Sequence, residues 1–290
     1  WNEELEIGWW SDFVGANKII DTNKYFVVCA NYIGGCYGST GPNSKNPITE
    51  ENYNFNFPQI SFKDIEVSQK LLLDHLGVIS LEAVIGPSIG GLMALEFCTL
   101  YPNYVNKLIS ISSGYKLSTI QLLHNLEQAY ILDLSKDSNV RKKEYLSLAR
   151  MIAHKTYISL ELLSKRAKSE SLYDDDLIEG FLNSPQESYM MHQGEKFIER
   201  FTPESYSSII KGWQNFNLEM ESISNLKNIK TLVISVDSDV CFYPEEQIDF
   251  VNILNDNKVQ NTYHMIQSTK GHDSFLLEPE LFHEIIENFL

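Results

Sequence analysis

Five short apolar runs stand out from an otherwise mixed sequence. They are rich in β-branched residues and read YFVVCA (25–30), LEAVIG (81–86), KLISISS (107–113), KTLVISV (230–236) and the looser NTYHMIQ (261–267). Runs that are apolar almost throughout, with little alternation, are typical of strands covered on both faces of a parallel sheet. We therefore predict five buried, parallel strands.

Helical patterns lie between the first of these runs, in residues 64–77 and 90–102. The positions that can share a helix face are Ile65, Leu72 and Leu76 in the first segment and Met93, Phe97 and Leu100 in the second. Alternation of strand and helix predicts an α/β fold, in which right-handed crossovers join the strands of a mostly parallel sheet.

Residues 114–225 differ from the rest of the chain, because they contain repeated helical patterns and no convincing strand. We expect an α/β core from residues 1–113 and 226–290, interrupted by a helical cap over the active site. The alternative is that these helices only pack beside the sheet, and the length of the insertion favours the cap. Residues 39–58 are polar and contain three prolines, which predicts a long loop.

Composition narrows the class of protein. The 290 residues, 43% of them hydrophobic, are enough for a sizeable core. The 39 acidic and 23 basic residues leave a formal net charge of −16, which argues against nucleic acid or an anionic membrane as the main partner. Four scattered cysteines without a CxxC pair favour free thiols and a cytoplasmic protein. No metal site is expected, because no HExxH motif or Cys/His cluster occurs.

The stretch VIGPSIGGL (84–92) joins an apolar run to a helical pattern, and GPSIG (86–90) fits the motif G-x-S-x-G. A nucleophile at such a turn has a strained backbone and needs small neighbours two residues away. The N–H of Ile89 would lie at the helix start, where it can stabilise an oxyanion. Two other interpretations of Ser88 stay open from the motif alone. One is a phosphate loop, which lacks the second glycine of G-x-G-x-x-G and a Walker lysine here; the other is a structural turn.

A serine nucleophile needs a base, and the base needs a carboxylate that orients it. In α/β-hydrolase folds the chain order is Ser, acid, His, with the acid and the histidine after late strands. Asp237 and Asp239 follow the run 230–236, and His272 lies in a glycine-containing loop after 261–267. Asp239 is preferred because it is further past the strand, with Asp237 as the alternative. Structural roles are expected for the remaining histidines, which are His75, His124, His154, His192, His264 and His283.

Seven blocks of the sequence carry a family resemblance. They are residues 8–42, 70–78, 86–97, 148–159, 189–201, 237–247 and 271–278, and they include GPSIGGLMALEF, LARMIAHKTYIS, DSDVCFYPEEQ and GHDSFLLE. In these blocks, and over nearly its whole length, the chain resembles the homoserine O-acetyltransferase family of α/β-hydrolase-fold acyltransferases.

The resemblance implies a reaction in two steps. Ser88 would be the nucleophile, Asp239 the acid and His272 the base of an acetyl transfer from acetyl-CoA, through an acyl-enzyme, to the hydroxyl of L-homoserine, a step of methionine biosynthesis. It also implies small-molecule substrates, acetyl-CoA as co-substrate with no bound cofactor, and a homodimer that forms through the cap helices.

Three further residues receive a role from the resemblance. Asp273 matches the family residue that holds the amino group of the acceptor, and Arg150 and Tyr157 match residues that contact substrate from the cap. A spacing of seven residues is about two helical turns, so Arg150 and Tyr157 can share one face. The alternatives are a solvated helix charge for Arg150 and a core position for Tyr157.

The sequence departs from the family at two residues and in one larger feature. Pro87 and Ile89 stand where the family has Gly and Met; Ile89 keeps its N–H, whereas Pro87 has none. The family also has early strands and a loop with a second oxyanion donor before the GWW at 8–10. The third strand of that fold lies between the strands expected at 25–30 and 81–86. We therefore hypothesise that this sequence is an incomplete chain, with its amino-terminal strands absent.

Other functions remain open from the sequence. Within the same family, the donor could be succinyl-CoA or the acceptor serine. Within the same fold, the protein could be an esterase that uses water as acceptor. A non-catalytic binding protein is the alternative from another class, and the intact order of Ser88, Asp239 and His272 argues against it.

Overall fold

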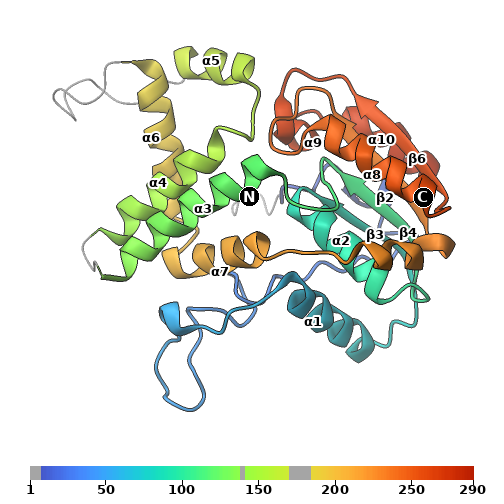
Figure 1. Cartoon of the computed structure of the whole chain (residues 1–290), viewed down its shortest axis with the longest axis horizontal. Helices are drawn as coiled ribbons and strands as arrows, with labels where there is room; N and C mark the ends of the chain where they lie inside the picture. The colour runs from blue at the N-terminus through green and yellow to red at the C-terminus, as the bar shows by residue number, and fades with distance from the viewer. Residues whose placement is uncertain (1–7, 138–140, 170–183) are drawn as a thin grey trace. The chain divides into compact units, whose positions relative to one another are not determined.

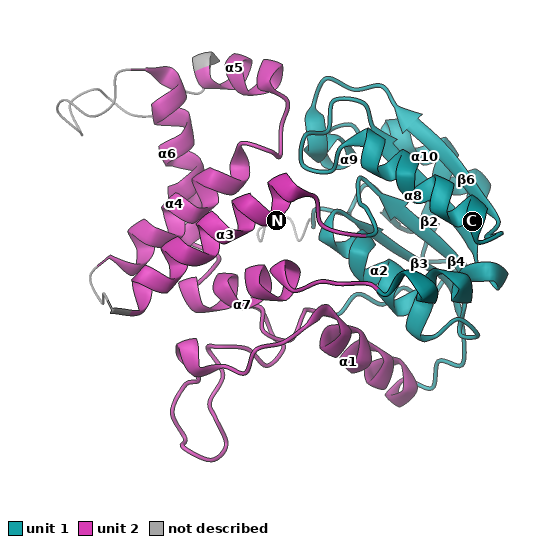
Figure 2. Ribbon diagram, viewed as in Figure 1, with its two compact units in different colours: residues 1–30, 77–115, 219–290 teal, residues 31–76, 116–218 magenta. Residues whose placement is uncertain are grey.

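The computed structural model describes residues 8–137, 141–169 and 184–290 (Figure 1). By their contacts the residues form two compact units (Figure 2), which are unit 1, residues 1–30, 77–115 and 219–290, and unit 2, residues 31–76 and 116–218. Unit 1 contains the sheet. The segment 31–76, which the sequence placed in the α/β core, groups with the helices of unit 2, and the helical segment of unit 2 runs over 116–218 in place of the expected 114–225.

A parallel sheet of four strands forms the centre of unit 1. In spatial order the strands are β3 (Leu81–Pro87), β4 (Val105–Ile111), β5 (Lys230–Val236) and β6 (Asn261–Ile266). Four of the five predicted strands are confirmed. Because all four run in the same direction, their carboxyl ends lie at one edge, and the loops that follow them meet there.

The remaining strand prediction, at residues 25–30, is wrong. Residues 25–30 form no strand, and Phe26 is 75% exposed. A strand needs a neighbour to pair its backbone N–H and C=O groups. In the described part of the chain no strand pairs with 25–30, and β3 is paired on one side only, with β4. Residues 25–30 do not pair with β3 either.

Helices cover both faces of the sheet. α2 (Ile89–Leu100) contacts β3 and β4, α8 (Pro244–Asp256) contacts β5 and β6, and α10 (Glu280–Phe289) contacts β6. α2 is buried around most of its circumference, on more sides than the single face predicted. The core on the α10 face contains residues of three strands and the helix, among them Ile109, Ile111, Leu232, Ile234, Phe282 and Ile286.

Shorter elements complete unit 1. They are the two-residue parallel strands β1 (Val14–Gly15) and β2 (Ile20–Asp21), the 3-10 helices η4 (Met220–Asn228) and η5 (Gly271–Asp273), and the short helix α9 (Ser274–Leu277).

In its described residues, unit 2 combines helices with the loops that join them and with the largely irregular segment 31–61. Its elements are α1 (Phe62–His75), α3 (Thr119–Leu134), α4 (Lys142–His154), α5 (Leu160–Ser169), α6 (Pro185–Ile198), α7 (Pro203–Gln214) and the 3-10 turns η1 (Asn54–Asn56) and η2 (Ser135–Asp137). α3 packs on α4 and α7, and α6 packs on α4 and α5. Apart from η1 and one bridge between Lys45 and Asn52, the predicted loop 39–58 has no regular structure.

Capping residues explain where these helices begin. Ser61 and Asp64 form a capping box at the start of α1, and Ser118 and Gln121 form another at α3. The predicted face of α1 is partly wrong. Ile65 is buried, but Leu76 lies past the last helical residue and is 46% exposed, and Leu73 is buried in its place.

Candidate active site

Ser88 lies at the turn between β3 and α2, as the G-x-S-x-G motif predicts. Its backbone has φ 55° and ψ −130°, an unfavourable conformation for a residue with a side chain. Two hydrogen bonds hold it: the Ser88 N–H donates to the Ile111 carbonyl at 2.9 Å, and the Ser113 hydroxyl donates to the Ser88 carbonyl at 2.6 Å. The strained turn is therefore held in place by the end of β4 and by the segment that follows it.

Glycines allow this turn to form, though not all at the expected positions. A Cβ on Gly86 would lie 2.0 Å from the Gly90 carbonyl oxygen, so only glycine fits at 86. Gly90 itself has room, since its nearest neighbour would be 3.5 Å away. The second crowded position is Gly91, where a Cβ would lie 2.4 Å from Cβ of Ser113.

Pro87 is compatible with the turn because of its place in the strand. Residues of a strand direct their backbone groups alternately to the two sides, and the Ser88 N–H is directed toward β4. The nitrogen of Pro87 therefore faces the other side of β3, where no described strand is paired. The missing N–H of proline costs no hydrogen bond with β4.

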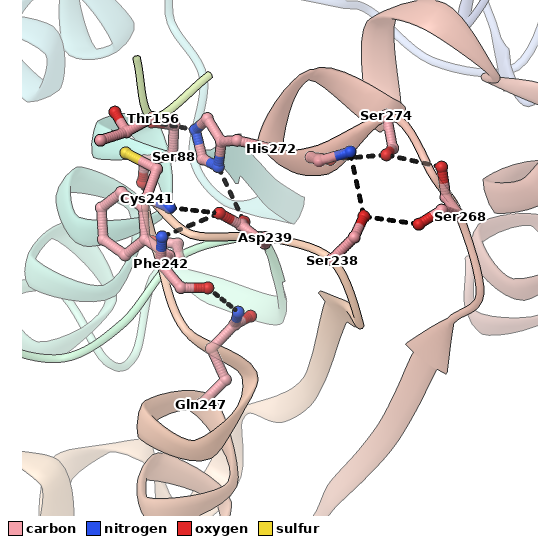
Figure 3. A network of polar contacts seen from close by, with 12 residues as sticks. Ser88, Thr156, Ser238, Asp239, Cys241, Phe242, Gln247, Ser268, His272 and Ser274 are labelled. Carbon is pink, nitrogen blue, oxygen red and sulfur yellow. Dashed lines mark hydrogen bonds and ion pairs between the residues drawn. The ribbon is translucent and has the colours of Figure 1, made fainter. Parts of the chain in front are cut away.

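The structure brings Ser88, His272 and Asp239 into one hydrogen-bonded chain (Figure 3). Nε2 of His272 lies 2.9 Å from Oγ of Ser88, and Nδ1 lies 2.8 Å from Oδ2 of Asp239. The other carboxylate oxygen of Asp239 accepts the N–H groups of Cys241 at 2.8 Å and Phe242 at 2.9 Å. This arrangement leaves Nε2 as the acceptor for the serine proton, because Nδ1 donates to the carboxylate.

The imidazole of His272 is buried between aromatic rings and its pKa is raised. The Phe242 ring stacks on it at 5.6 Å between centroids, and the Phe275 ring meets it edge-on at 5.7 Å. Burial acts to lower the pKa of His272, but the charge of Asp239, the hydrogen bond to it and the charge of Asp273 together raise that pKa above its ordinary value. Neither phenylalanine was predicted as a neighbour of the imidazole, although each lies three residues from Asp239 or His272.

Asp237, the alternative acid, does not contact His272. Its side chain is exposed at the end of β5, and Oδ1 accepts the N–H of Ser268 at 3.0 Å. Asp239 is buried, with 1% exposed. Of these two carboxylates, the turn that follows β5 brings Asp239 to His272 and leaves Asp237 beside Ser268.

The other histidines lie where the sequence placed them. His75, His124, His154, His192 and His283 are in helices, and His264 is in β6 with an exposed side chain. His154 is buried in unit 2, where its Nε2 lies 3.1 Å from the Tyr189 hydroxyl. Burial and the charges of Arg150 and Arg166 lower the pKa of His154 to about 4.

Arg150 and Tyr157 meet in unit 2. The Arg150 guanidinium lies over the Tyr157 ring, 4.6 Å from its centroid, and 4.8 Å from the centroid of Phe197. A shared helix face does not explain this contact, because α4 ends at His154 and Tyr157 lies in the turn beyond it. Stacking on two aromatic faces, absent from the sequence reasoning, holds the guanidinium.

Asp273 and Ile89, two further residues of the predicted site, also belong to unit 1, and each directly follows a residue of the hydrogen-bonded chain. Asp273 follows His272 directly, ends η5 and is partly buried. Ile89 is the first residue of α2. The first N–H groups of a helix have no partner within the helix, and the positive end of the helix dipole lies there.

Other chemistry is limited in the described residues. No group of three or more His, Cys, Asp or Glu side chains among them is placed to hold a metal ion. The four cysteines, Cys29, Cys36, Cys98 and Cys241, are thiols that take part in no disulfide. In the same part of the chain, no helix combines the length and the apolar character that crossing a membrane requires.

Comparison of the sequence with known proteins gives a family. A family model described as alpha/beta hydrolase fold matches residues 7–279. The chain is 42% identical to a homoserine O-acetyltransferase of Methanosalsum zhilinae, over 98% of this chain and 60% of that protein. It is 34% identical to a homoserine O-acetyltransferase of Nautilia profundicola, over 98% of this chain and 81% of that protein.

Solved structures share the fold. The chain superposes on a homoserine O-acetyltransferase from Bacillus anthracis with a TM-score of 0.88 and 24% identity, covering 99% of this chain and 82% of that one. It superposes on esterase E22 with a TM-score of 0.88 and 20% identity, covering 97% and 82%. The chain spans about 60% of the length of the first relatives it matches. On the family model and the sequence relatives together, the chain belongs to the homoserine O-acetyltransferase family of the α/β-hydrolase fold.

Proposed function

We propose that this protein transfers an acetyl group from acetyl-CoA to the hydroxyl of L-homoserine through an acyl-enzyme on Ser88. The observation that carries the proposal is the chain of hydrogen bonds from Ser88 through His272 to Asp239, in a protein of this family. The chain has the parts that serine acyl transfer requires: a nucleophile, a base within hydrogen-bond reach and a carboxylate that orients the base.

In the first half-reaction, Ser88 Oγ attacks the thioester carbonyl carbon and His272 Nε2 takes the serine proton. The resulting imidazolium is stabilised by Asp239, which accepts from Nδ1. When the tetrahedral intermediate collapses, the C–S bond breaks and His272 returns the proton to the leaving thiolate. Free CoA and an acetyl ester on Ser88 result.

In the second half-reaction, the hydroxyl of homoserine takes the place of CoA. It gives its proton to His272 Nε2 as its oxygen attacks the ester carbonyl. Collapse of the second intermediate breaks the bond to Ser88, whose Oγ takes the proton back from His272. Both intermediates carry a negative oxygen, for which the Ile89 N–H is the proposed donor; losing one such donor typically costs about 10²–10³ in kcat.

We assign Asp273, Arg150 and Tyr157 to substrate binding. Asp273 brings a negative charge next to the base, which suits the ammonium group of an amino-acid acceptor. Arg150 is a cation held against two aromatic rings, and its guanidinium suits an anionic group of a substrate such as a carboxylate or a phosphate. A cytoplasmic location would fit both substrates.

We also propose a homodimer through the helices of unit 2. α3 supports this, because much of its apolar surface is exposed, at Ile120, Leu122, Leu123, Leu126, Tyr130 and Leu134. Residues 120, 123, 130 and 134 follow the spacing of a helix that packs along another helix. A second copy of the chain would present the same stripe, so that the two apolar surfaces could bury each other.

The test uses the two half-reactions separately. Without acceptor, the protein should catalyse exchange of labelled CoA into acetyl-CoA, and mass spectrometry should find an acetyl group on the Ser88 peptide. L-homoserine should discharge it, and Ser88→Ala should abolish both signals. Succinyl-CoA and L-serine, tested in parallel, decide the donor and the acceptor.

Two outcomes would contradict the proposal. An acetyl group that water removes as fast as homoserine does would make the protein an esterase. No exchange and no acetyl group with the unaltered chain would leave it a binding protein that keeps the fold.

A further inference from the structure

A second set of hydrogen bonds joins the loop of Asp239 to the loop of His272. The N–H of Gly271, the residue before the histidine, donates to the Ser238 hydroxyl at 3.0 Å. That hydroxyl donates in turn to the carbonyl of Ser268. Figure 3 shows Ser238, Ser268 and Ser274 grouped beside the histidine loop. We call these three residues the serine network.

The serine network holds Gly271 on both sides. Its N–H is bound by Ser238, and its carbonyl accepts the Ser274 hydroxyl. Gly271 has φ +78°, in the left-handed region that glycine adopts without strain. The two peptide groups that flank Gly271 are thus fixed by hydroxyls, and the second of them is the peptide that carries His272.

Each hydroxyl of the serine network has one proton to donate, and this decides which atom donates and which accepts in each hydrogen bond. Ser268 Oγ contacts the Glu278 carboxylate, which only accepts when ionised, so the single Ser268 proton goes there. Ser268 Oγ then accepts from the Lys270 N–H at 3.0 Å and from Ser274 Oγ at 2.9 Å. Ser274 shares its own proton between Ser268 Oγ and the Gly271 carbonyl. Every hydroxyl proton in the network has an acceptor.

The serine network runs alongside the catalytic hydrogen bond, one residue earlier in each loop. Asp239 binds His272 at 2.8 Å, and Ser238 binds Gly271 at 3.0 Å. One loop cannot slide past the other without breaking both contacts. The imidazole must stay within hydrogen-bond reach of Ser88, and a displacement of about 1 Å in such a site can cost on the order of 10²-fold in rate.

We propose that Ser238 is a positioning residue, whose hydroxyl holds Gly271 and thereby keeps His272 aimed at Ser88. This role rests on the proposed function only in requiring that Ser88 and His272 react together. It needs no particular donor or acceptor.

Ser238→Ala tests the role, since it removes the acceptor of the Gly271 N–H. Ser238→Thr keeps a hydroxyl and should restore it. The matched control is Ser235→Ala in β5, which deletes a buried hydroxyl that bonds Tyr263 at 2.6 Å and does not touch Gly271. Two readouts are measured: the second-order rate at which an alkyl fluorophosphonate modifies Ser88, and the far-downfield proton resonance of the His272 Nδ1–H.

We expect Ser238→Ala to slow the modification of Ser88 by about tenfold or more, and to broaden or shift the Nδ1 proton. Ser238→Thr should return both toward the unaltered protein. Ser235→Ala should lose stability but keep both readouts. The proposal is overturned if Ser238→Ala behaves like Ser235→Ala.

The test of Ser238 can be decided independently of the test of acetyl transfer. If the protein reacts with the fluorophosphonate but transfers no acetyl group to homoserine, the proposed function fails and the comparison of Ser238 variants still decides their role. If the protein does not react with the probe, the Nδ1 proton decides instead. An unchanged resonance in Ser238→Ala then refutes positioning.

Discussion

Nε2 of His272 lies 2.9 Å from Oγ of Ser88, although the two residues are 184 positions apart in the chain. In the proposed reaction the two residues act as one unit, because a serine hydroxyl is a weak nucleophile until a base takes its proton. Ser88→Ala and His272→Ala should each lower kcat for acetyl transfer by at least about 10⁴-fold. The double variant should be no slower than either single one. Measured losses that multiply would show that the residues act independently.

The two aspartates should differ sharply. Asp239→Asn should lower kcat by about 10⁴-fold, because an amide at this position favours the wrong imidazole tautomer. Asp237→Asn keeps an oxygen for the Ser268 N–H and should change kcat by less than about tenfold. Steady-state rates of both variants check this, with circular dichroism to confirm folding. Equal losses would contradict the assignment.

The pH dependence follows from the raised pKa of His272. The base must be neutral to take the serine proton, so activity should rise with pH through a midpoint above about 6.5, the ordinary value for histidine. CoA release in the absence of acceptor is the measurement, since it avoids titration of homoserine. Asp239→Asn should move the midpoint of its residual activity to lower pH. A midpoint below the ordinary histidine value in the unaltered protein would contradict the prediction.

His154 should make the protein less stable in acid. Its pKa is lowered to about 4 in the fold, so below about pH 6.5 the unfolded chain binds a proton that the folded chain does not. Stability should fall as the pH drops from about 6.5 to about 4, by roughly 2 kcal/mol between pH 7 and pH 5. Urea unfolding at those two pH values measures it.

His154→Gln should reduce this pH-dependent loss by the same amount. The matched control is His264→Gln, which replaces an exposed histidine of β6 and should leave the loss unchanged. An identical loss in His154→Gln and the unaltered protein would show that another group is responsible.

The exposed stripe on α3 should decide the oligomeric state. Leu123 and Tyr130 are 51% and 66% exposed, and replacing both with Glu should shift sedimentation from dimer to monomer at micromolar concentration, because charges would be buried in the interface. Ile79→Glu, at a residue of unit 1 that is 88% exposed, should leave the dimer intact. A dimer that survives the α3 changes would place the interface elsewhere.

Much of the fold was predictable from local pattern. Apolar runs marked β3, β4, β5 and β6, and periodic apolar positions marked the helices of 116–218, because side-chain period is a property of a few adjacent residues. The same pattern failed at 25–30, where the run is apolar but unpaired. A strand depends on a neighbour that may be far away in sequence, and local pattern carries no information about it.

The sequence by itself determined the turn at Ser88, the chain order of serine, aspartate and histidine, and the edge of the sheet where they meet. Only the tertiary structure decided that Asp239 and not Asp237 binds His272, that Gly91 is the second crowded glycine, and that Ser238 holds Gly271. The reason is physical. Turns and strands follow from neighbouring residues, whereas these contacts join segments 22 or more residues apart, and their geometry is set by how the strands are ordered and packed.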